Sequence, residues 1–291
     1  MTARARFWTI MLTHTGLAAG TYIMGKAATA HFPVLALGLF RFLLAALCFL
    51  LLMGLRGTRL GPLLREDWRG FLLSGFLGVV LNQLGFLWGL KLTLPSHGAL
   101  LYALTPTVVL LHGWLKGTEK PTRRKLAGIV LAFSGVAWLF SSRQDGTLPP
   151  TWLAGDFLIL LAVVAWAAFT VQSRPLLLKH GPEAATSLTI LLGTVLFLPV
   201  GAFGLRDFHP ASIPFSAWLG AAYLGLVSSV VMYLLWFRAL SLREASRVSI
   251  VANGQPILTA LLAWAVFGTP PTAAFGVGAA LVIAGVVIAQ T

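Results

Sequence analysis

Charged residues are scarce in this sequence, and cysteine is almost absent. Only 10% of the 291 residues are charged, whereas 58% are hydrophobic, and the mean hydropathy is +0.87. Soluble domains carry about 25% charged residues, so the composition excludes a soluble globular protein and predicts an all-α polytopic membrane protein. The single cysteine, Cys48, lies in an apolar run, which excludes a disulfide framework and a cysteine-based metal site.

Acidic residues are rarer still, and none lies in the middle of a predicted span. The eight acids fall in loops or at span ends: Glu66, Asp67, Glu119, Asp145, Asp156, Glu183, Asp207 and Glu244. This distribution argues against a carboxylate proton relay and an acidic cation pathway, and it leaves a metal ion no cage of hard ligands. The G-x-x-x-x-G-K-[ST], H-E-x-x-H and G-x-S-x-G patterns are also missing, so ATP, metalloprotease and serine-hydrolase chemistry lack support. We therefore expect no cofactor and no bound metal.

The formal charge of +13 lies in short loops between apolar runs, so it carries topology information and does not indicate a nucleic-acid partner. If the N-terminus is cytoplasmic, 16 of the 21 Lys and Arg residues fall on the cytoplasmic side and four fall outside, with Arg41 inside a span. The positive-inside bias then predicts that both termini are cytoplasmic.

The apolar runs are about 17–23 residues long and predict ten transmembrane helices in a bilayer. They fall at roughly 8–26, 33–55, 69–90, 97–116, 124–141, 152–172, 184–204, 215–238, 247–267 and 272–290. The loops between them are too short to hold a separate soluble domain.

The second half of the sequence repeats the first at a spacing of 150 residues. The shift aligns pairs of scarce residue types without a gap: Trp68 with Trp218, Pro106 with Pro256, Trp114 with Trp264, Gly128 with Gly278, and Gly135 with Gly285. We therefore divide the chain into two five-helix repeats, 1–142 and 151–291. Because five is odd, the second repeat must cross the membrane upside down, an arrangement associated with alternating access around a central cavity. Duplication that serves folding alone is the alternative.

The sequence resembles the ten-helix, EamA-type exporters of the drug/metabolite transporter superfamily. The resemblance rests on "LGLFRFLLAALCFLLL" in the second span, on "LPSHGALLYALTPTVVLLHGWLKGTEKPTRRKLAGIVLAFSGVAWL" in the fourth and fifth, and on the matching pattern in the second half. It implies a bundle of two inverted repeats around a central cavity and export from the cytoplasm. One departure is "THTGLAAGTY" in the first span, where these transporters often carry a Trp.

Pro106 and Pro256 lie near the middle of the fourth and ninth predicted spans. The resemblance implies that both spans line the cavity. A mid-helix proline bends the helix and frees a carbonyl one turn back, here near Tyr102 and Ala252. Two readings stay open, ordinary packing kinks and a pair of hinges that gate opposite sides of the membrane.

Polar and aromatic residues at membrane depth are the candidate substrate contacts. They are His14, Tyr22, Arg41, Asn82, Gln83, Tyr102, Trp166, Tyr233, Asn253 and Gln255. Two roles are open for Arg41: a structural group that caps backbone carbonyls, or a clamp for a substrate carboxylate or phosphate. Two roles are also open for His14. It is either a group that titrates or binds substrate, or a neutral histidine that is hydrogen-bonded to a neighbouring helix.

These features predict a secondary exporter of small polar or amphipathic metabolites in a bacterial cytoplasmic (inner) membrane. By resemblance, the leading substrates are amino acids and amino-acid-like compounds, including opine-type metallophores. The expected partners are the small-molecule substrate, the lipid bilayer and the enzymes that make the exported compound. The alternative is a membrane enzyme or a scaffold that does not transport. The sequence leaves the substrate, the coupling ion and the oligomeric state open.

Overall fold

The computed structural model describes residues 3–57, 60–115, 122–141, 150–243, 248 and 254–290. In these residues the chain is built from helices and has no strand. The prediction of an all-α polytopic membrane protein is therefore confirmed. Asn253 and Ala252, which the sequence singled out, lie outside the described residues.

The first half contains α1 (Ala3–Thr29), α2 (Val34–Leu55), α3 (Leu60–Gly75), η1 (Phe76–Leu81), α4 (Asn82–Leu92), α5 (Pro95–Tyr102), α6 (Thr105–Leu115) and α7 (Arg123–Ser141). The second half contains α8 (Trp152–His180), α9 (Pro182–Phe203), η2 (Pro210–Ser212), α10 (Phe215–Ala222), η3 (Tyr223–Val231), α11 (Met232–Leu242), α13 (Gln255–Phe267) and α14 (Ala273–Gln290). The segments η1 and η3 are π-helical and join the helices on either side of them into continuous rods.

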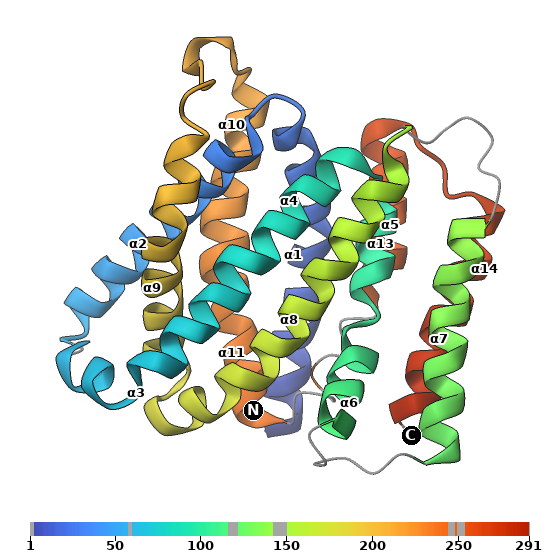
Figure 1. Cartoon of the computed structure of the whole chain (residues 1–291), viewed down its shortest axis with the longest axis horizontal. Coiled ribbons are helices and arrows are strands. Elements are labelled where there is room, and N and C mark those ends of the chain that lie inside the picture. The colour runs from blue at the N-terminus through green and yellow to red at the C-terminus, as the bar shows by residue number, and fades with distance from the viewer. Residues whose placement is uncertain are drawn as a thin grey trace.

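Each of the ten predicted spans overlaps helices in the described part of the chain, and residues 249–253 of the ninth span lie outside it. Seven helical stretches, one of them made of α5 and α6 together, are long and apolar enough to cross a membrane, and two shorter apolar helices, α13 and α14, complete the second half. The first span, α1, has 27 residues but does not reach the same hydropathy, because Thr13, His14 and Thr15 interrupt its apolar run. Both ends of the chain lie at the same end of the molecule (Figure 1), as an even number of crossings requires.

Helices α7 and α14 pair through glycines at one side of the bundle (Figure 1). A Cβ added to Gly135 would lie 2.8 Å from the carbonyl oxygen of Gly278, and Gly128 approaches Gly285 in the same way. Since Gly128 is equivalent to Gly278 in the 150-residue register, and Gly135 to Gly285, the two contacts are reciprocal. Reciprocal contacts are the mark of a two-fold axis, and the crossed order makes α7 and α14 antiparallel.

A second contact between the halves follows the same rule. A Cβ on Gly75 would lie 2.7 Å from the backbone nitrogen of Gly193, and a Cβ on Gly225 would lie 2.8 Å from the side chain of Leu44. Gly75 and Gly225 are equivalent in the register, and Leu44 lies one position from the equivalent of Gly193. The glycines let helices of the two halves approach closely, as small residues do in membrane proteins.

The fourth span is interrupted rather than bent, which corrects the prediction of a mid-helix proline. α5 ends at Tyr102 and α6 begins at Thr105, so Pro106 lies in the first turn of a new helix, where a proline costs little. The carbonyl of Tyr102 accepts a hydrogen bond of 2.7 Å from the hydroxyl of Thr105. Pro256 likewise lies in the first turn of α13.

Candidate functional site

A cavity lies at the centre of the bundle between the two halves. Its empty volume is about 680 Å³, a figure that includes space open to solvent. Sixteen residues line it: His14, Ala18, Thr21, Tyr22, Arg41, Asn82, Gln83, Phe86, Tyr102, Thr105, Trp166, Ser228, Met232, Tyr233, Trp236 and Gln255. The lining residues contain one permanent charge, on Arg41, and no carboxylate.

Nine of the ten candidate residues named from the sequence fall in this lining, and the tenth, Asn253, lies outside the described residues. The structure therefore brings together side chains from α1, α2, α4, α5, α8, α11 and α13. Six further lining residues were not predicted from the sequence: Ala18, Thr21, Phe86, Thr105, Ser228 and Met232. These are small or apolar residues, for which a single sequence gives no signal. Trp236 also lines the cavity and was not among the ten candidates.

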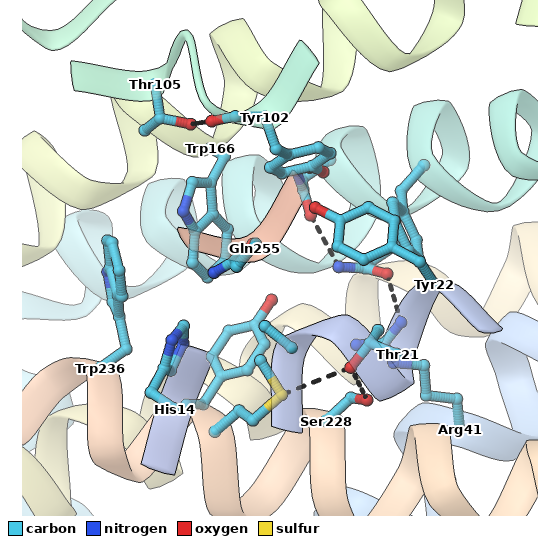
Figure 2. Close-up of a pocket in the computed structure, with 16 residues that line it drawn as sticks. His14, Thr21, Tyr22, Arg41, Tyr102, Thr105, Trp166, Ser228, Trp236 and Gln255 are labelled. Atoms are coloured by element: carbon cyan, nitrogen blue, oxygen red, sulfur yellow. Dashed lines mark hydrogen bonds between the residues drawn. The ribbon is translucent and has the colours of Figure 1, made fainter. Parts of the chain in front are cut away.

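Arg41 lies at one side of the cavity and is only 3% exposed (Figure 2). Its Nε donates to the hydroxyl of Ser229 at 2.6 Å, and its Nη1 donates to Oε1 of Gln83 at 2.6 Å. Both acceptors are neutral. Within the described part of the chain, Nη2 has no hydrogen-bond partner and no carboxylate pairs with the guanidinium.

A chain of amides holds Arg41 in place. Gln83 donates through Nε2 to Oδ1 of Asn82 at 2.6 Å, and Asn82 donates to the hydroxyl of Tyr102 at 2.7 Å and to the carbonyl of Ala162 at 2.8 Å. The amide groups of Asn82 and Gln83 are thus oriented by their neighbours. Because the amide nitrogen of Gln83 donates to Asn82, the amide oxygen of Gln83 faces Arg41. In the described part of the chain, both hydrogen bonds of Arg41 go to side chains and neither caps a backbone carbonyl, which was one of the two hypotheses for this residue.

His14 and Trp236 lie together at the opposite side of the cavity (Figure 2). Their rings are 5.2 Å apart between centroids, and the side chains are buried. Among the described residues, neither Nδ1 of His14 nor Nε1 of Trp236, both buried, has a hydrogen-bond partner. An unsatisfied buried polar group costs about 1–3 kcal/mol, so this side of the cavity wall holds two polar groups whose hydrogen bonds are not made in this conformation.

Aromatic rings form two further parts of the wall. On one side, Tyr22, Phe86 and Tyr102 meet edge to face, with centroids 5.6–6.0 Å apart. On the other, Trp166 contacts Tyr233 at 5.4 Å and Trp236 at 5.5 Å. Edge-to-face arrangements are favourable for aromatic pairs, so the rings form firm apolar surfaces around the polar groups.

Two helix N-termini end in the cavity wall. α6 begins at Thr105 and α13 begins at Gln255, and both residues line the cavity. They are equivalent in the 150-residue register, so each half contributes one helix N-terminus at the same place. The N-terminus of a helix carries a partial positive charge, and interrupted helices of this kind present that charge to anionic groups of substrates in transporters.

The comparison with known proteins decides the family. The model of the EamA-like transporter family matches residues 7–141 and again residues 153–291. This chain belongs to the EamA-like transporter family. It is therefore a membrane transporter, and the two matches fall on the two halves of the sequence repeat.

Relatives and a solved structure agree with this assignment. The chain is 28% identical to the uncharacterized transporter YyaM of Bacillus subtilis (strain 168), over 93% of this chain and 88% of that protein. It is 29% identical to an uncharacterized transporter of Archaeoglobus fulgidus, over 92% of this chain and 91% of that protein. A probable terminal-alkyne amino-acid exporter of Streptantibioticus cattleyicolor is 24% identical over 74% of this chain and 71% of its own length. A solved crystal structure with 21% identity matches 99% of this chain and 96% of its own, with a TM-score of 0.67, and shows that the two share a fold.

Proposed function

We propose that this EamA-family transporter is a secondary exporter of small carboxylate-bearing metabolites, with amino acids and amino-acid-like compounds, including opine-type metallophores, as the leading class. The observation that carries the proposal is Arg41, a buried guanidinium in the cavity wall whose hydrogen-bond acceptors are neutral. A buried charge is costly unless it is paired. A substrate carboxylate supplies the missing counter-charge, and Nη2 is available to bind it.

The rest of the lining fits the other parts of such a solute. The helix starts at Thr105 and Gln255 favour a negative group, while the rings around Trp166 suit an apolar side chain. Nδ1 of His14 and Nε1 of Trp236 offer polar contacts at the far side. The described lining residues include no acid, so a compound whose only charge is positive finds no carboxylate partner among them. The relative named as an amino-acid exporter supports the same class.

The proposed mechanism is alternating access between two inverted repeats. The reciprocal contacts of Gly135 with Gly278 and of Gly75 with Gly193 support a two-fold relation between the halves. Exchange of the two halves' conformations then opens the cavity to either side in turn. We place both termini in the cytoplasm because of the positive charges, so that the end where α4 ends and α5 and α8 begin faces outside. A periplasmic alkaline phosphatase fused after Thr291 must then be inactive.

The enzyme alternative has less support. In the described cavity wall, the hydroxyls of Thr21 and Ser228 are 2.7 Å apart, but neither has a histidine or carboxylate partner to act as a base. A scaffold would not need a buried cavity with unsatisfied polar groups.

Thermal stabilisation of the purified protein by paired compounds tests the substrate class. Tryptophan and phenylalanine are compared with tryptamine and phenethylamine, which keep the ring and the amine and lack the carboxylate. A ligand present at 100 times its Kd stabilises the folded state by about 2.7 kcal/mol. We expect the amino acids to raise the melting temperature and the amines not to do so. Equal shifts for acid and amine, or shifts for the amines alone, would rule out recognition of the carboxylate.

A further inference from the structure

The charges in the described cavity wall are all of one sign. Arg41 carries the only permanent charge among the described lining residues. Thr105 and Gln255, which also line the cavity, begin α6 and α13, and the N-terminus of a helix carries a partial positive charge. The described wall therefore attracts an anion and repels a cation.

The acidic side chains in the described part of the chain lie elsewhere. Asp156, which the sequence places at a span end, is fully buried, and its carboxylate is already bonded to the hydroxyl of Thr93 at 2.5 Å and to Nδ1 of His97 at 2.8 Å. Residues 249–253, which lie outside the described residues just before α13, contain no acid in the sequence. The other described acids pair on or near the surface or are exposed: Glu66 and Asp67 with Lys179, Glu183 with Arg56 and Arg238, and Asp207 before α10. Glu119, Asp145 and Glu244 lie outside the described residues.

The nitrogen of the cargo decides the total charge of the loaded cavity. A free amino acid is a zwitterion, so its carboxylate balances Arg41 while its ammonium leaves one positive charge in the cavity. A carboxylate without an ammonium leaves no net charge. A buried charge is costly unless it is paired, and the described wall offers an ammonium no acid to pair with.

Gln255 offers a neutral partner for an uncharged nitrogen group. Its side chain lines the cavity (Figure 2) and is only 7% exposed. Its amide makes no hydrogen bond with another described residue. A primary amide both donates and accepts hydrogen bonds. This matches an acylated nitrogen, where the acyl carbonyl accepts and the N–H donates.

We propose that the preferred cargo of this cavity is a carboxylate that carries no ammonium group, with N-acylated amino acids as the class that fits best. Arg41 binds the carboxylate, Gln255 bonds to the acyl amide, and the loaded cavity has no net charge. Free amino acids bind through the same carboxylate, but more weakly. This inference rests on the proposed function and narrows its substrate class.

Four indole compounds separate the two charges. N-acetyl-L-tryptophan carries only the carboxylate, L-tryptophan carries both charges, tryptamine carries only the ammonium, and N-acetyl-L-tryptophanamide carries neither. The melting temperature of the purified protein over a range of ligand concentrations gives an apparent Kd for each compound. We expect the Kd of N-acetyl-L-tryptophan to lie at least about tenfold below that of L-tryptophan, and the other two compounds not to stabilise the protein.

The outcomes separate this inference from the proposed function. A Kd for L-tryptophan equal to or below that of N-acetyl-L-tryptophan would overturn the inference and leave recognition of carboxylates intact. Absence of stabilisation by N-acetyl-L-tryptophan would overturn the inference as well. Equal stabilisation by N-acetyl-L-tryptophan and N-acetyl-L-tryptophanamide would show that the carboxylate is not recognised, which removes the proposed function together with the inference.

A charge change in the wall tests the same reasoning from the side of the protein. Gln255→Glu keeps the size of the side chain and adds a carboxylate that can pair with an ammonium. We expect the preference for N-acetyl-L-tryptophan over L-tryptophan to fall about tenfold or to invert. Ala211→Glu adds the same charge at an exposed position before α10 and must keep the preference of the parent protein. A preference that is unchanged in Gln255→Glu would contradict the inference.

The role of the Gln255 amide is tested by Gln255→Leu, which removes the amide and adds no charge. Binding of N-acetyl-L-tryptophan should weaken about 2- to 10-fold, as expected for the loss of one neutral hydrogen bond. Binding of indole-3-propionate, which has the carboxylate and no amide, should not change. Equal losses for both compounds would show that Gln255 does not contact the acyl amide. The compound series in the parent protein needs no variant, so it decides the inference where a variant does not fold.

Discussion

Nη1 of Arg41 lies 2.6 Å from Oε1 of Gln83, an amide oxygen where a buried guanidinium would ordinarily find a carboxylate. Arg41 comes from α2, and Gln83 comes from the start of α4. Asn82 fixes the orientation of Gln83, so the amides present the charge to the cavity without neutralising it. This relationship makes the site selective for anionic groups in the proposed function.

Removing the charge at Arg41 tests that reading. Arg41→Gln keeps hydrogen-bonding capacity and loses the charge, and a charge-assisted hydrogen bond contributes about 1.5–3 kcal/mol. We expect the apparent affinity for tryptophan to fall about 10- to 100-fold, while binding of tryptamine changes little. Arg206→Gln, at an exposed arginine that stacks on Phe203, is the control. A variant at position 41 that binds tryptophan as tightly as the parent protein would show that Arg41 is structural.

The indole N–H of Trp236 can be removed while an aromatic ring is kept at this position. Trp236→Phe deletes the unsatisfied Nε1 and keeps aromatic packing against His14 and Trp166. We expect an unchanged or raised melting temperature, because an unsatisfied buried group is lost, together with weaker binding of tryptophan. His14→Phe should behave in the same way. The control is Trp264→Phe, at a tryptophan that is 54% exposed. A large loss of stability with unchanged binding would make Trp236 a packing residue only.

The interruption of the fourth span can be tested by a double-mutant cycle. Thr105→Val removes the hydroxyl that bonds to the carbonyl of Tyr102 and should lower stability by about 1 kcal/mol. Pro106→Ala restores a backbone N–H four residues after Tyr102, the spacing of a helical hydrogen bond. The cost of Thr105→Val should therefore be smaller in the Pro106→Ala background. Equal costs in both backgrounds would mean that the proline does not decide how this carbonyl is bonded.

The glycine contact between α7 and α14 is expected to be needed for the pairing of the two halves. In Gly135→Ala the new methyl group would lie 2.8 Å from the carbonyl oxygen of Gly278, so the helices must move apart, and we expect the melting temperature in detergent to fall. Gly276→Ala is the matched control on α14, because a Cβ there meets nothing within 4 Å. If both variants melt at the same temperature, the close approach of α7 and α14 does not stabilise the protein.

The sequence predicted the helices well because membrane spans follow from composition. Apolar length and charge in loops require no knowledge of contacts, and even the marginal α1 was found. The repeat was visible because Trp and Pro are scarce enough for their coincidence to be informative. Intramembrane polar residues face the protein interior, which is why His14, Arg41 and Gln83 could be selected before their contacts were known.

The features that could not be predicted from the sequence depend on which residues meet in the folded protein. Pro106 signals a break in a helix, but only the backbone shows that α5 ends and α6 begins there. Asp156 looked like an interfacial acid, since nothing in the sequence joins it to His97, 59 residues away. Small lining residues such as Ala18 and Ser228 have no signal at all, because many other residues of the same kind pack between helices.

Flux in inside-out membrane vesicles tests the central claim most directly. Vesicles that contain the protein are given a mixture of radiolabelled L-amino acids under an imposed proton gradient, beside vesicles from cells without the protein and vesicles with Arg41→Gln. Export from the cytoplasm corresponds to accumulation inside such vesicles. We predict accumulation above background with the parent protein and loss of that accumulation with Arg41→Gln. Accumulation that is equal in all three preparations, with the protein folded and inserted, would contradict the proposal that this cavity exports carboxylate-bearing metabolites.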